Sequence, residues 1–287
     1  IKGFDPDTEI RAERDGDHLK IQAGNGRYRL ATLPFENFPV FDHSKPLGDV
    51  VIDAALLAKL LDKTRFAMAK ADVRYYLRGL SLQAEAGEFR AVSSDGHRLA
   101  VCTSGVAAGL DRASIVPRRA VLELGRLASA AAGDVTLTLA ENMITARIGG
   151  VRMSSKLIEG RFPDYQRVMP RELVRKVVIN RDALVKALGR AMLLSQENYK
   201  SVAVRSIHGG LEIKATNPEA EEAVETVDAE LTRLAFEVGF NGAYLVDALG
   251  KLESEKAILE LTDGCNSCLI SDQADESFKF VVMPMRL

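Results

Sequence analysis

The sequence predicts an α+β protein made of repeated domains, each with two helices packed on mostly antiparallel sheets. Two observations predict this class. A collinear series of sequence patterns occurs twice, and the equivalent positions Asp53 and Asn180 lie 127 residues apart. Each copy also combines two helix patterns with several short strand patterns. A hydrophobic content of 47% and a charged content of 27% are those of a globular chain, so long disordered regions are not expected.

Each copy begins with a strand followed by a helix. The segments "VVIDAALLAKLL" (residues 50–61) and "VVINRDALVKAL" (residues 177–188) share an apolar start. Asp53 and Asn180 follow that start, and both are residue types that cap helix N-termini. In the first copy, leucines spaced on one helical face predict a helix from about residue 54 to residue 69.

The later elements of the two copies also correspond. Turn patterns follow the next strand pair, "SSDGHRLAV" in one copy and "TNPEAEEAV" in the other, and Asp95-Gly96 predicts a tight turn. Second helices are expected over residues 118–129 and 242–254, each followed by an alternating strand. The copies close on strands that begin at Val151 and Phe278, again 127 residues apart.

An incomplete third copy precedes these two. Residues 18–39 predict two strands joined by a type I′ turn at Asn25-Gly26, and the end of this segment matches the end of the next copy. We therefore expect the C-terminal remnant of one domain at residues 1–47, a second domain at residues 48–172 and a third at residues 173–287.

Basic residues recur on equivalent helix faces. The net charge of −2 means that a nucleic-acid-binding role would require these residues to be gathered on one surface. Lys59 and Lys63 share a face of one helix, and Lys186 and Arg190 share a face of its counterpart. On a single helix such residues are usually only solvated. Their repetition favours a surface that follows phosphates without reading bases.

Patterns typical of enzymes are weak in this sequence. Cys265-x-x-Cys268 could hold a metal or a redox pair, but no second Cys/His pair accompanies it, and the preceding Asp-Gly indicates a hairpin turn. Asp95 and His97 are too close in sequence to form a catalytic relay. We predict no catalytic residue, no metal and no cofactor. Three cysteines suit a reducing cytoplasm, and no apolar run reaches the length of a transmembrane helix.

Five segments make the chain resemble a known family. They are "VRYYL" (73–77), "SDGHRLAVC" (94–102), "SKLIEGRFPDYQRVMP" (155–170), "TNPEAEEA" (216–223) and "FVVMPMRL" (280–287). With them the sequence resembles, over essentially its whole length, the bacterial sliding clamp, the beta subunit of DNA polymerase III. That family has three similar domains per chain, and two chains join head to tail into a ring around duplex DNA. The resemblance implies that the domains present here form an arc of such a ring and that most of the first domain is missing.

The resemblance implies a non-catalytic processivity factor and three sets of functional residues. Its expected partners are double-stranded DNA of any sequence, the replicative polymerase, the clamp loader, other proteins carrying a clamp-binding peptide, and a second copy of the chain. The walls of a peptide groove between the second and third domains would be Arg74, Tyr76, Leu77, Ser94, Gly96, His97, Arg98, Leu99, Pro163, Arg167, Val168, Asn241, Tyr244, Cys265, Ser267, Val281, Val282, Met283, Pro284, Met285 and Arg286. The DNA-facing residues would be Lys59, Lys63, Tyr75, Tyr76, Arg118, Arg119, Arg126, Arg181, Lys186 and Arg190. The dimer interface would join Leu193 and Leu194 to Phe38 and Val40 of the other subunit.

Two other classes of function stay open at this point. One is a monomeric peptide-binding adaptor that keeps the groove without closing a ring. The other is a zinc or thiol enzyme built on Cys265 and Cys268, which would require bound metal or a reactive thiol.

Overall fold

The computed structural model describes residues 3–38, 45–85, 87–106, 109–195, 200–232, 235–262 and 267–286. The chain divides into two compact units, residues 1–43 and residues 44–287. We describe each unit by itself.

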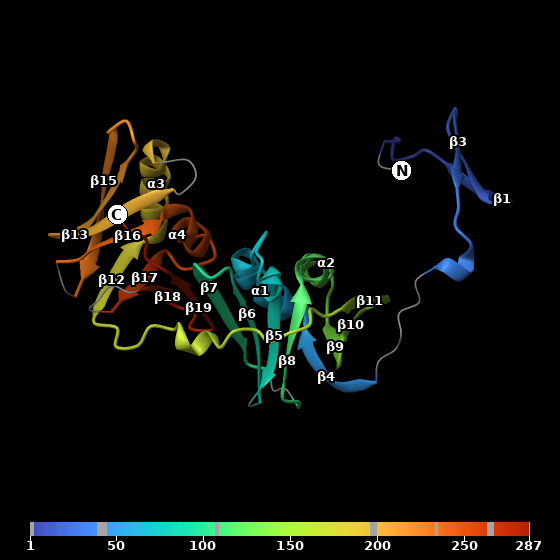
Figure 1. The fold of residues 1–287 in the computed structure, drawn as a ribbon, viewed down its shortest axis with the longest axis horizontal. Coiled ribbons are helices and arrows are strands. Elements are labelled where there is room, and N and C mark those ends of the chain that lie inside the picture. The colour runs from blue at the N-terminus through green and yellow to red at the C-terminus, as the bar shows by residue number, and fades with distance from the viewer. Residues whose placement is uncertain are drawn as a thin grey trace. The chain divides into compact units, whose positions relative to one another are not determined.

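The first unit is a three-stranded antiparallel sheet in the order β1-β2-β3 (Figure 1). Its strands are β1 (Ile10–Asp15), β2 (His18–Ala23) and β3 (Gly26–Ala31). The hairpin between β2 and β3 turns at Gly24-Asn25, because Ala23 pairs with Gly26. The expected turn at Asn25-Gly26 is therefore wrong by one residue. A positive φ of 53° at Gly24 alone fits a type II′ turn, which needs glycine at its first central position.

In the second unit the same order of elements occurs twice, as the repeat predicted (Figure 1). We call residues 45–174 the central copy and residues 175–286 the C-terminal copy. The central copy contains β4 (Pro46–Asp53), α1 (Ala54–Thr64), β5 (Gly79–Glu85), β6 (Glu88–Ser94), β7 (Arg98–Ser104), β8 (Arg112–Pro117), α2 (Arg118–Ser129), β9 (Asp134–Ala140), β10 (Met143–Ile148) and β11 (Val151–Lys156). The C-terminal copy contains β12 (Arg175–Asn180), α3 (Arg181–Ala191), β13 (Ser201–Ile207), β14 (Gly210–Thr216), β15 (Glu222–Leu231), β16 (Glu237–Asn241), α4 (Gly242–Leu249), β17 (Lys256–Leu261), β18 (Cys268–Asp272) and β19 (Phe278–Val282).

Short 3-10 turns connect several of these elements. They are η1 (Phe35–Asn37), η2 (Arg65–Ala67), η3 (Tyr75–Arg78), η4 (Tyr165–Arg167) and η5 (Met192–Leu194).

The first helix of each copy begins at the predicted cap. The Asp53 carboxylate accepts hydrogen bonds from the backbone N–H groups of Ala55 (2.9 Å) and Leu56 (3.1 Å). The Asn180 side chain accepts one from the third residue of its helix. α1 ends at Thr64, earlier than the predicted residue 69, and the Thr64 hydroxyl donates to the Leu60 carbonyl at 2.7 Å. Of the apolar residues that prolonged the pattern, Phe66 and Ala67 belong to η2, and Met68 and Ala69 lie beyond it.

The second helix of the C-terminal copy is also shorter than predicted, whereas α2 spans the predicted residues 118–129. α4 ends at Leu249, and a buried carboxylate, Asp272, holds the loop that follows. Asp272 accepts the backbone N–H groups of Glu253 (2.7 Å) and Ser254 (3.0 Å), and also that of Ala274 (2.9 Å). Burial raises the pKa of Asp272, but these hydrogen bonds outweigh burial and lower it to about 2.

Two sheets organise the second unit. A four-stranded sheet has the order β11-β10-β9-β4, and a twelve-stranded sheet has the order β16-β13-β14-β15-β12-β17-β18-β19-β7-β6-β5-β8. The long sheet crosses from one copy to the other where β19 pairs antiparallel with β7, from Phe278 opposite Cys102 to Val282 opposite Arg98. β19 is thus an interior strand of the sheet, with β18 on one side and β7 on the other.

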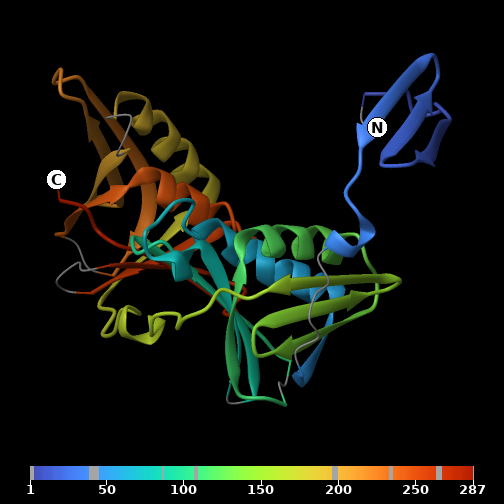
Figure 2. The same ribbon diagram turned by 45° about the vertical axis from the view of Figure 1, so that its right-hand side comes forward.

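Apolar clusters lie on both faces of the joint between the copies. The main core fills the space beneath the helices, where α1 lies beside α2 and α3 beside α4 (Figures 1 and 2). A second, smaller cluster includes Val92, Leu99, Leu269 and Val281. Phe162, from the segment between β11 and β12, covers this second cluster. Strands buried on both faces read as continuous apolar runs, which "FVV" (residues 280–282) in β19 illustrates.

Candidate functional site

The C-terminal residues lie along the joint between the two copies. Beyond β19, the Met283 backbone N–H donates to the His97 carbonyl at 2.9 Å. Two residues further on, the Met285 N–H donates to the Gly239 carbonyl at 2.8 Å. The end of the chain therefore runs from the central copy to the edge strand β16 of its own copy. Met283 and Met285 are half-buried along this path, and the side chains of Pro284 and Arg286 are exposed.

The second apolar cluster forms a floor beside this path. Leu77, Leu99 and Val281 are buried in it, and Tyr76 packs against it from η3. Val168 follows η4 and is exposed. Tyr165 and Met169 of the same segment pack on the cluster. The structure thus brings segments from η3, η4, β7 and β19 around one apolar cluster. An apolar floor with a few polar groups at its rim is the usual composition of a peptide-binding groove.

Arg98 fixes the rim of this surface by joining the copies. Its Nε lies 3.0 Å from Asp95 Oδ2, and its Nη1 lies 2.5 Å from Asp247 Oδ2 on α4. Nη2 donates to the Phe66 carbonyl at 3.1 Å. The guanidinium carbon lies 4.3 Å from the centre of the Tyr244 ring, within cation–π distance. Burial raises the pKa of Tyr244, and the nearby Asp95 carboxylate adds to this rise. Arg98 is therefore a structural clamp at the predicted groove, with little of its side chain left for solvent.

Arg74 closes the same rim from the other side. It forms a bidentate pair with Asp72, at 3.0 and 2.8 Å, and donates to the Asp95 carbonyl at 3.2 Å. The Arg74 guanidinium lowers the pKa of Asp72 to about 2. Gly96 has a φ of 88°, which favours glycine, and a Cβ there would lie 2.7 Å from Arg74 Nη2, so a larger residue would displace the Arg74 guanidinium.

The remaining predicted groove residues differ in accessibility. His97, Pro163 and Arg167 are exposed, Ser94 and Asn241 are half-buried, and Val282 and Ser267 are buried beneath the surface. Cys265 lies outside the described residues. Asn241 caps α4, where its side chain accepts the N–H groups of the second and third helical residues.

Sequence reasoning missed three residues that this rim requires. Asp95 was interpreted only as a turn residue, and Phe66 and Asp247 were not considered. Two of them had a detectable signal in the sequence. Asp95 lies three residues before Arg98, and Asp247 lies three residues after Tyr244 on the same helix face. The other two partners of Arg98, Asp247 and Phe66, are far from it in the chain, so spacing alone could not identify those contacts.

Two of the predicted DNA-facing residues lie at the joint between the copies instead. The Lys63 side chain is 6% exposed, and its ammonium donates to the Lys251 carbonyl and lies 2.9 Å from Glu253 Oε1. Lys59 Nζ lies 2.5 Å from Asp275 Oδ2, and this hydrogen bond raises the pKa of Lys59. The prediction for Lys63 is wrong, because its charge is buried against the C-terminal copy. The charge of Lys59 is compensated across the same joint.

The other predicted DNA-facing arginines have varied surroundings. Arg118 donates to the Met68 carbonyl at 3.3 Å and Arg181 to the Leu252 carbonyl at 2.6 Å. Arg126 pairs with Glu123 on its own helix, and Arg190 pairs with Glu225 on β15. Among the described residues, the exposed pair Arg119 and Lys186 forms no ion pair. Tyr75 and Tyr76 pack edge to face, with ring centres 5.8 Å apart.

Residues predicted for a dimer interface are exposed where the structure describes them. Leu193 is 80% exposed in η5 and Phe38 is 71% exposed just after η1, while Leu194 is half-buried. Val40 lies outside the described residues. Exposed large apolar side chains fit a protein–protein contact.

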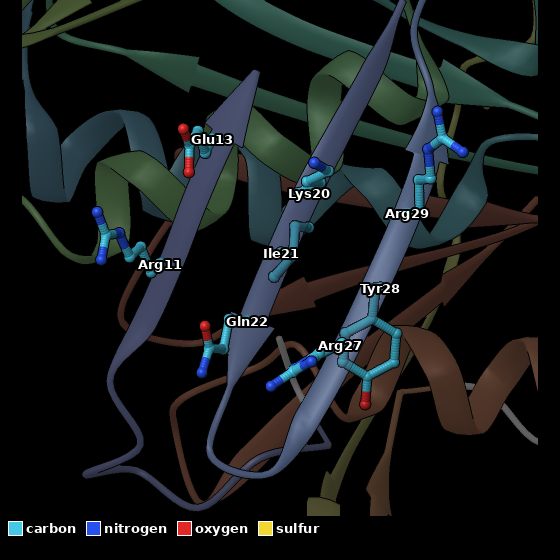
Figure 3. Close-up of a pocket in the computed structure, with 8 residues that line it drawn as sticks. All are labelled: Arg11, Glu13, Lys20, Ile21, Gln22, Arg27, Tyr28 and Arg29. Carbon is cyan, nitrogen blue, oxygen red and sulfur yellow. The ribbon is translucent and has the colours of Figure 1, made fainter. Parts of the chain in front are cut away.

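The first unit has a shallow pocket of about 390 Å³ on one face of its sheet. Figure 3 shows its side chains along the three strands: Arg11, Glu13, Lys20, Ile21, Gln22, Arg27, Tyr28 and Arg29. Glu13 is opposite Lys20 in the β1–β2 pairing, and it is the one acidic residue of the pocket beside four basic ones, Arg11, Lys20, Arg27 and Arg29. Such a face is typical of a solvated antiparallel sheet.

The two cysteines that the structure describes, Cys102 and Cys268, are both buried. Burial raises the pKa of the Cys102 thiol to about 11, and Cys268 is buried at the start of β18. Within the described ranges, no group of three or more His, Cys, Asp or Glu residues is placed to bind a metal ion. The helices of the described residues also include none that is long and apolar enough to cross a membrane.

Comparisons with known proteins agree over the whole second unit. Residues 51–164 match the family model of the central domain of the DNA polymerase III beta subunit, and residues 166–286 match that of its C-terminal domain. The beta sliding clamp of Proteus mirabilis is 40% identical over 288 residues, which cover 100% of this chain and 78% of that protein.

Solved structures show the same relationship. The DNA polymerase III subunit beta from Pseudomonas aeruginosa has a TM-score of 0.92 and 38% identity, covering 100% of this chain and 79% of that one. A sliding clamp from the same organism bound to griselimycin has a TM-score of 0.91 and 39% identity, covering 100% of this chain and 78% of that one.

Proposed function

The chain belongs to the beta sliding clamp family, the beta subunits of DNA polymerase III, and from this membership we propose that it forms part of a ring around duplex DNA. The ring tethers the replicative polymerase and other proteins that carry a clamp-binding peptide. One observation carries the proposal: β19 and β7 join the two copies edge to edge in one sheet. A joint of this kind can be repeated from domain to domain, which a closed ring requires.

Ring closure would use this joint a second time, between two copies of the chain. β15 corresponds to β7 in the repeat, and over residues 222–228 it pairs only with β14 among the described strands. β3 corresponds to β19. By the β19–β7 register, Tyr28 of a second copy would lie opposite Val224, and Arg27 opposite Glu225. An unpaired strand edge with exposed apolar and charged side chains is suited to such pairing.

The surface around the second apolar cluster would bind the partner peptides. Leu77, Leu99 and Val281 offer an apolar floor, and Met283 and Met285 offer adaptable side chains at its rim. Peptides with two apolar anchors and a glutamine fit a floor of this kind. The chain then works through binding alone, without catalytic activity of its own, in the cytoplasm. The domain boundaries at residues 48–172 and 173–287 remain part of this proposal.

The DNA contact would be electrostatic and independent of base sequence. Arg119 is exposed on α2 of the central copy, and Lys186 is exposed on α3 of the C-terminal copy. Their charges are available to phosphates, unlike that of Lys63. Contacts made only to phosphates hold DNA without stopping it from sliding.

A topological assay separates the ring from the monomeric adaptor. The chain is loaded on nicked circular DNA by a clamp loader, and its retention is measured before and after the circle is cut once. A ring stays on the circle and slides off the linear product. A chain that never remains on circular DNA but still binds a clamp-binding peptide is the adaptor.

A further inference from the structure

Arg90 on β6 is a half-buried cation that is not among the proposed groove residues. Its side chain is 14% exposed, although its ion-pair partner Glu88, 2.6 Å from Nη2, is 55% exposed. The other terminal nitrogen, Nη1, donates a hydrogen bond to the Tyr165 hydroxyl at 2.8 Å. Nε is buried without a hydrogen-bond partner. An ion pair with Glu88 could form at the surface without burying the Arg90 side chain. The burial that is observed leaves the Nε donor unsatisfied, which costs free energy.

Tyr165 controls the turn that presents the outer wall of the groove. It opens η4, and its carbonyl accepts the N–H groups of Val168 (3.0 Å) and Met169 (3.2 Å). Asp164 adds a second restraint, since its carboxylate accepts the Gln166 N–H at 3.2 Å. Gln166, Arg167 and Val168 are exposed, whereas Tyr165 is half-buried and packs on the second apolar cluster, so the position of Tyr165 sets the position of Val168.

We infer that Arg90 is a positioning residue for partner binding, acting through Tyr165. The Tyr165 ring packs on the second apolar cluster, which fixes its depth but leaves its hydroxyl end free to shift. The guanidinium fixes that end, and the turn with Val168 and the exposed Arg167 is thereby held in its binding position. The inference rests on the proposed peptide-binding function. It adds a residue that lies outside the groove itself.

Losing the Arg90–Tyr165 hydrogen bond should lower the fraction of chains in which the turn is in its binding position. A groove whose turn is held in place only part of the time binds with an affinity reduced by that fraction. Losing one hydrogen bond from a charged donor corresponds to roughly a 10-fold change in that population. The association rate should fall, while dissociation of the bound peptide should change little, because the bound peptide itself keeps the turn in place.

The experiment compares Tyr165→Phe, Arg90→Met and the double variant with the unchanged chain. The probe is a fluorescent synthetic peptide with one glutamine and two leucine anchors, and its association and dissociation rates are measured. Arg205→Met is the matched control, because Arg205 forms a similar strand-borne pair with Glu212 at 2.6 Å. Each single variant should weaken binding roughly 10-fold, and the double variant should be no weaker than either.

Hydrogen exchange gives a readout that does not depend on the peptide. The N–H groups of Val168 and Met169 should exchange faster in Tyr165→Phe and Arg90→Met, and should be unchanged in Arg205→Met. Unchanged affinity and unchanged exchange in Tyr165→Phe would overturn the inference. If the unchanged chain fails to bind the peptide, the proposed peptide-binding function is refuted. If the two variants still exchange faster than the unchanged chain, the positioning of the turn by Arg90 and Tyr165 is nevertheless supported.

Discussion

Deletion of residues 283–287 tests the joint and the groove together. It removes the backbone hydrogen bonds from Met283 to His97 (2.9 Å) and from Met285 to Gly239 (2.8 Å). Each such bond contributes about 1 kcal/mol, so the free energy of unfolding should fall by roughly 2 kcal/mol. β19 keeps both neighbouring strands, and the C-terminal copy should stay folded.

The same deletion should affect peptide binding more strongly. It removes two half-buried methionine side chains from the rim, along with the exposed Arg286. Losing contacts of this kind costs about 2–5 kcal/mol, which would move a micromolar dissociation constant to roughly 30 µM or higher. Retention on circular DNA should persist, because the terminus lies on the sheet rather than on the helices that carry Arg119 and Lys186.

The assay pairs calorimetric titration of the peptide with urea unfolding of the deletion variant. A second variant, Met285→Ala, keeps the backbone hydrogen bond and removes only the side chain, so it separates the two effects. We expect Met285→Ala to lose affinity with a smaller loss of stability than the deletion. Full peptide affinity in the deletion variant would refute the reasoning, since the terminus would then serve packing alone.

Three further predictions concern DNA, assembly and pH. Replacing Arg119 and Lys186 by alanine should lower the slope of DNA affinity against salt concentration, on logarithmic axes, by about 2, and an unchanged slope would place the DNA elsewhere. Charged residues in place of Leu193 and Leu194 should yield a smaller assembly by light scattering, whereas an unchanged mass would exclude them from the interface. Burial raises the pKa of Asp272, but hydrogen bonds outweigh it and lower the pKa to about 2, below the ordinary 3.8. Stability should therefore be complete above about pH 5 and fall by up to about 2 kcal/mol toward pH 2, and Asp272→Asn should reduce this pH dependence in urea unfolding.

Much of the fold could be predicted because its signals are local. Asp53 and Asn180 cap helices through bonds to residues two or three positions away, and those bonds depend on residue type and spacing alone. The apolar period of each helix likewise identifies its buried face. The hairpin at Gly24-Asn25 shows the limit of such signals, since two adjacent glycine-containing pairs compete for the turn and strand register decides between them.

The candidate site depended more on tertiary structure. A helical pattern shows that Lys59 and Lys63 lie outside the apolar face of α1, but it cannot show which residues they contact. The C-terminal copy supplies Asp275 and Glu253 there, so both lysines form ion pairs between the two copies. Sequence alone determined the two copies, their helix starts and the apolar last strand. The tertiary structure decided the partners of that strand and of Arg98, because residues that are distant along the chain become neighbours only when the copies pair edge to edge.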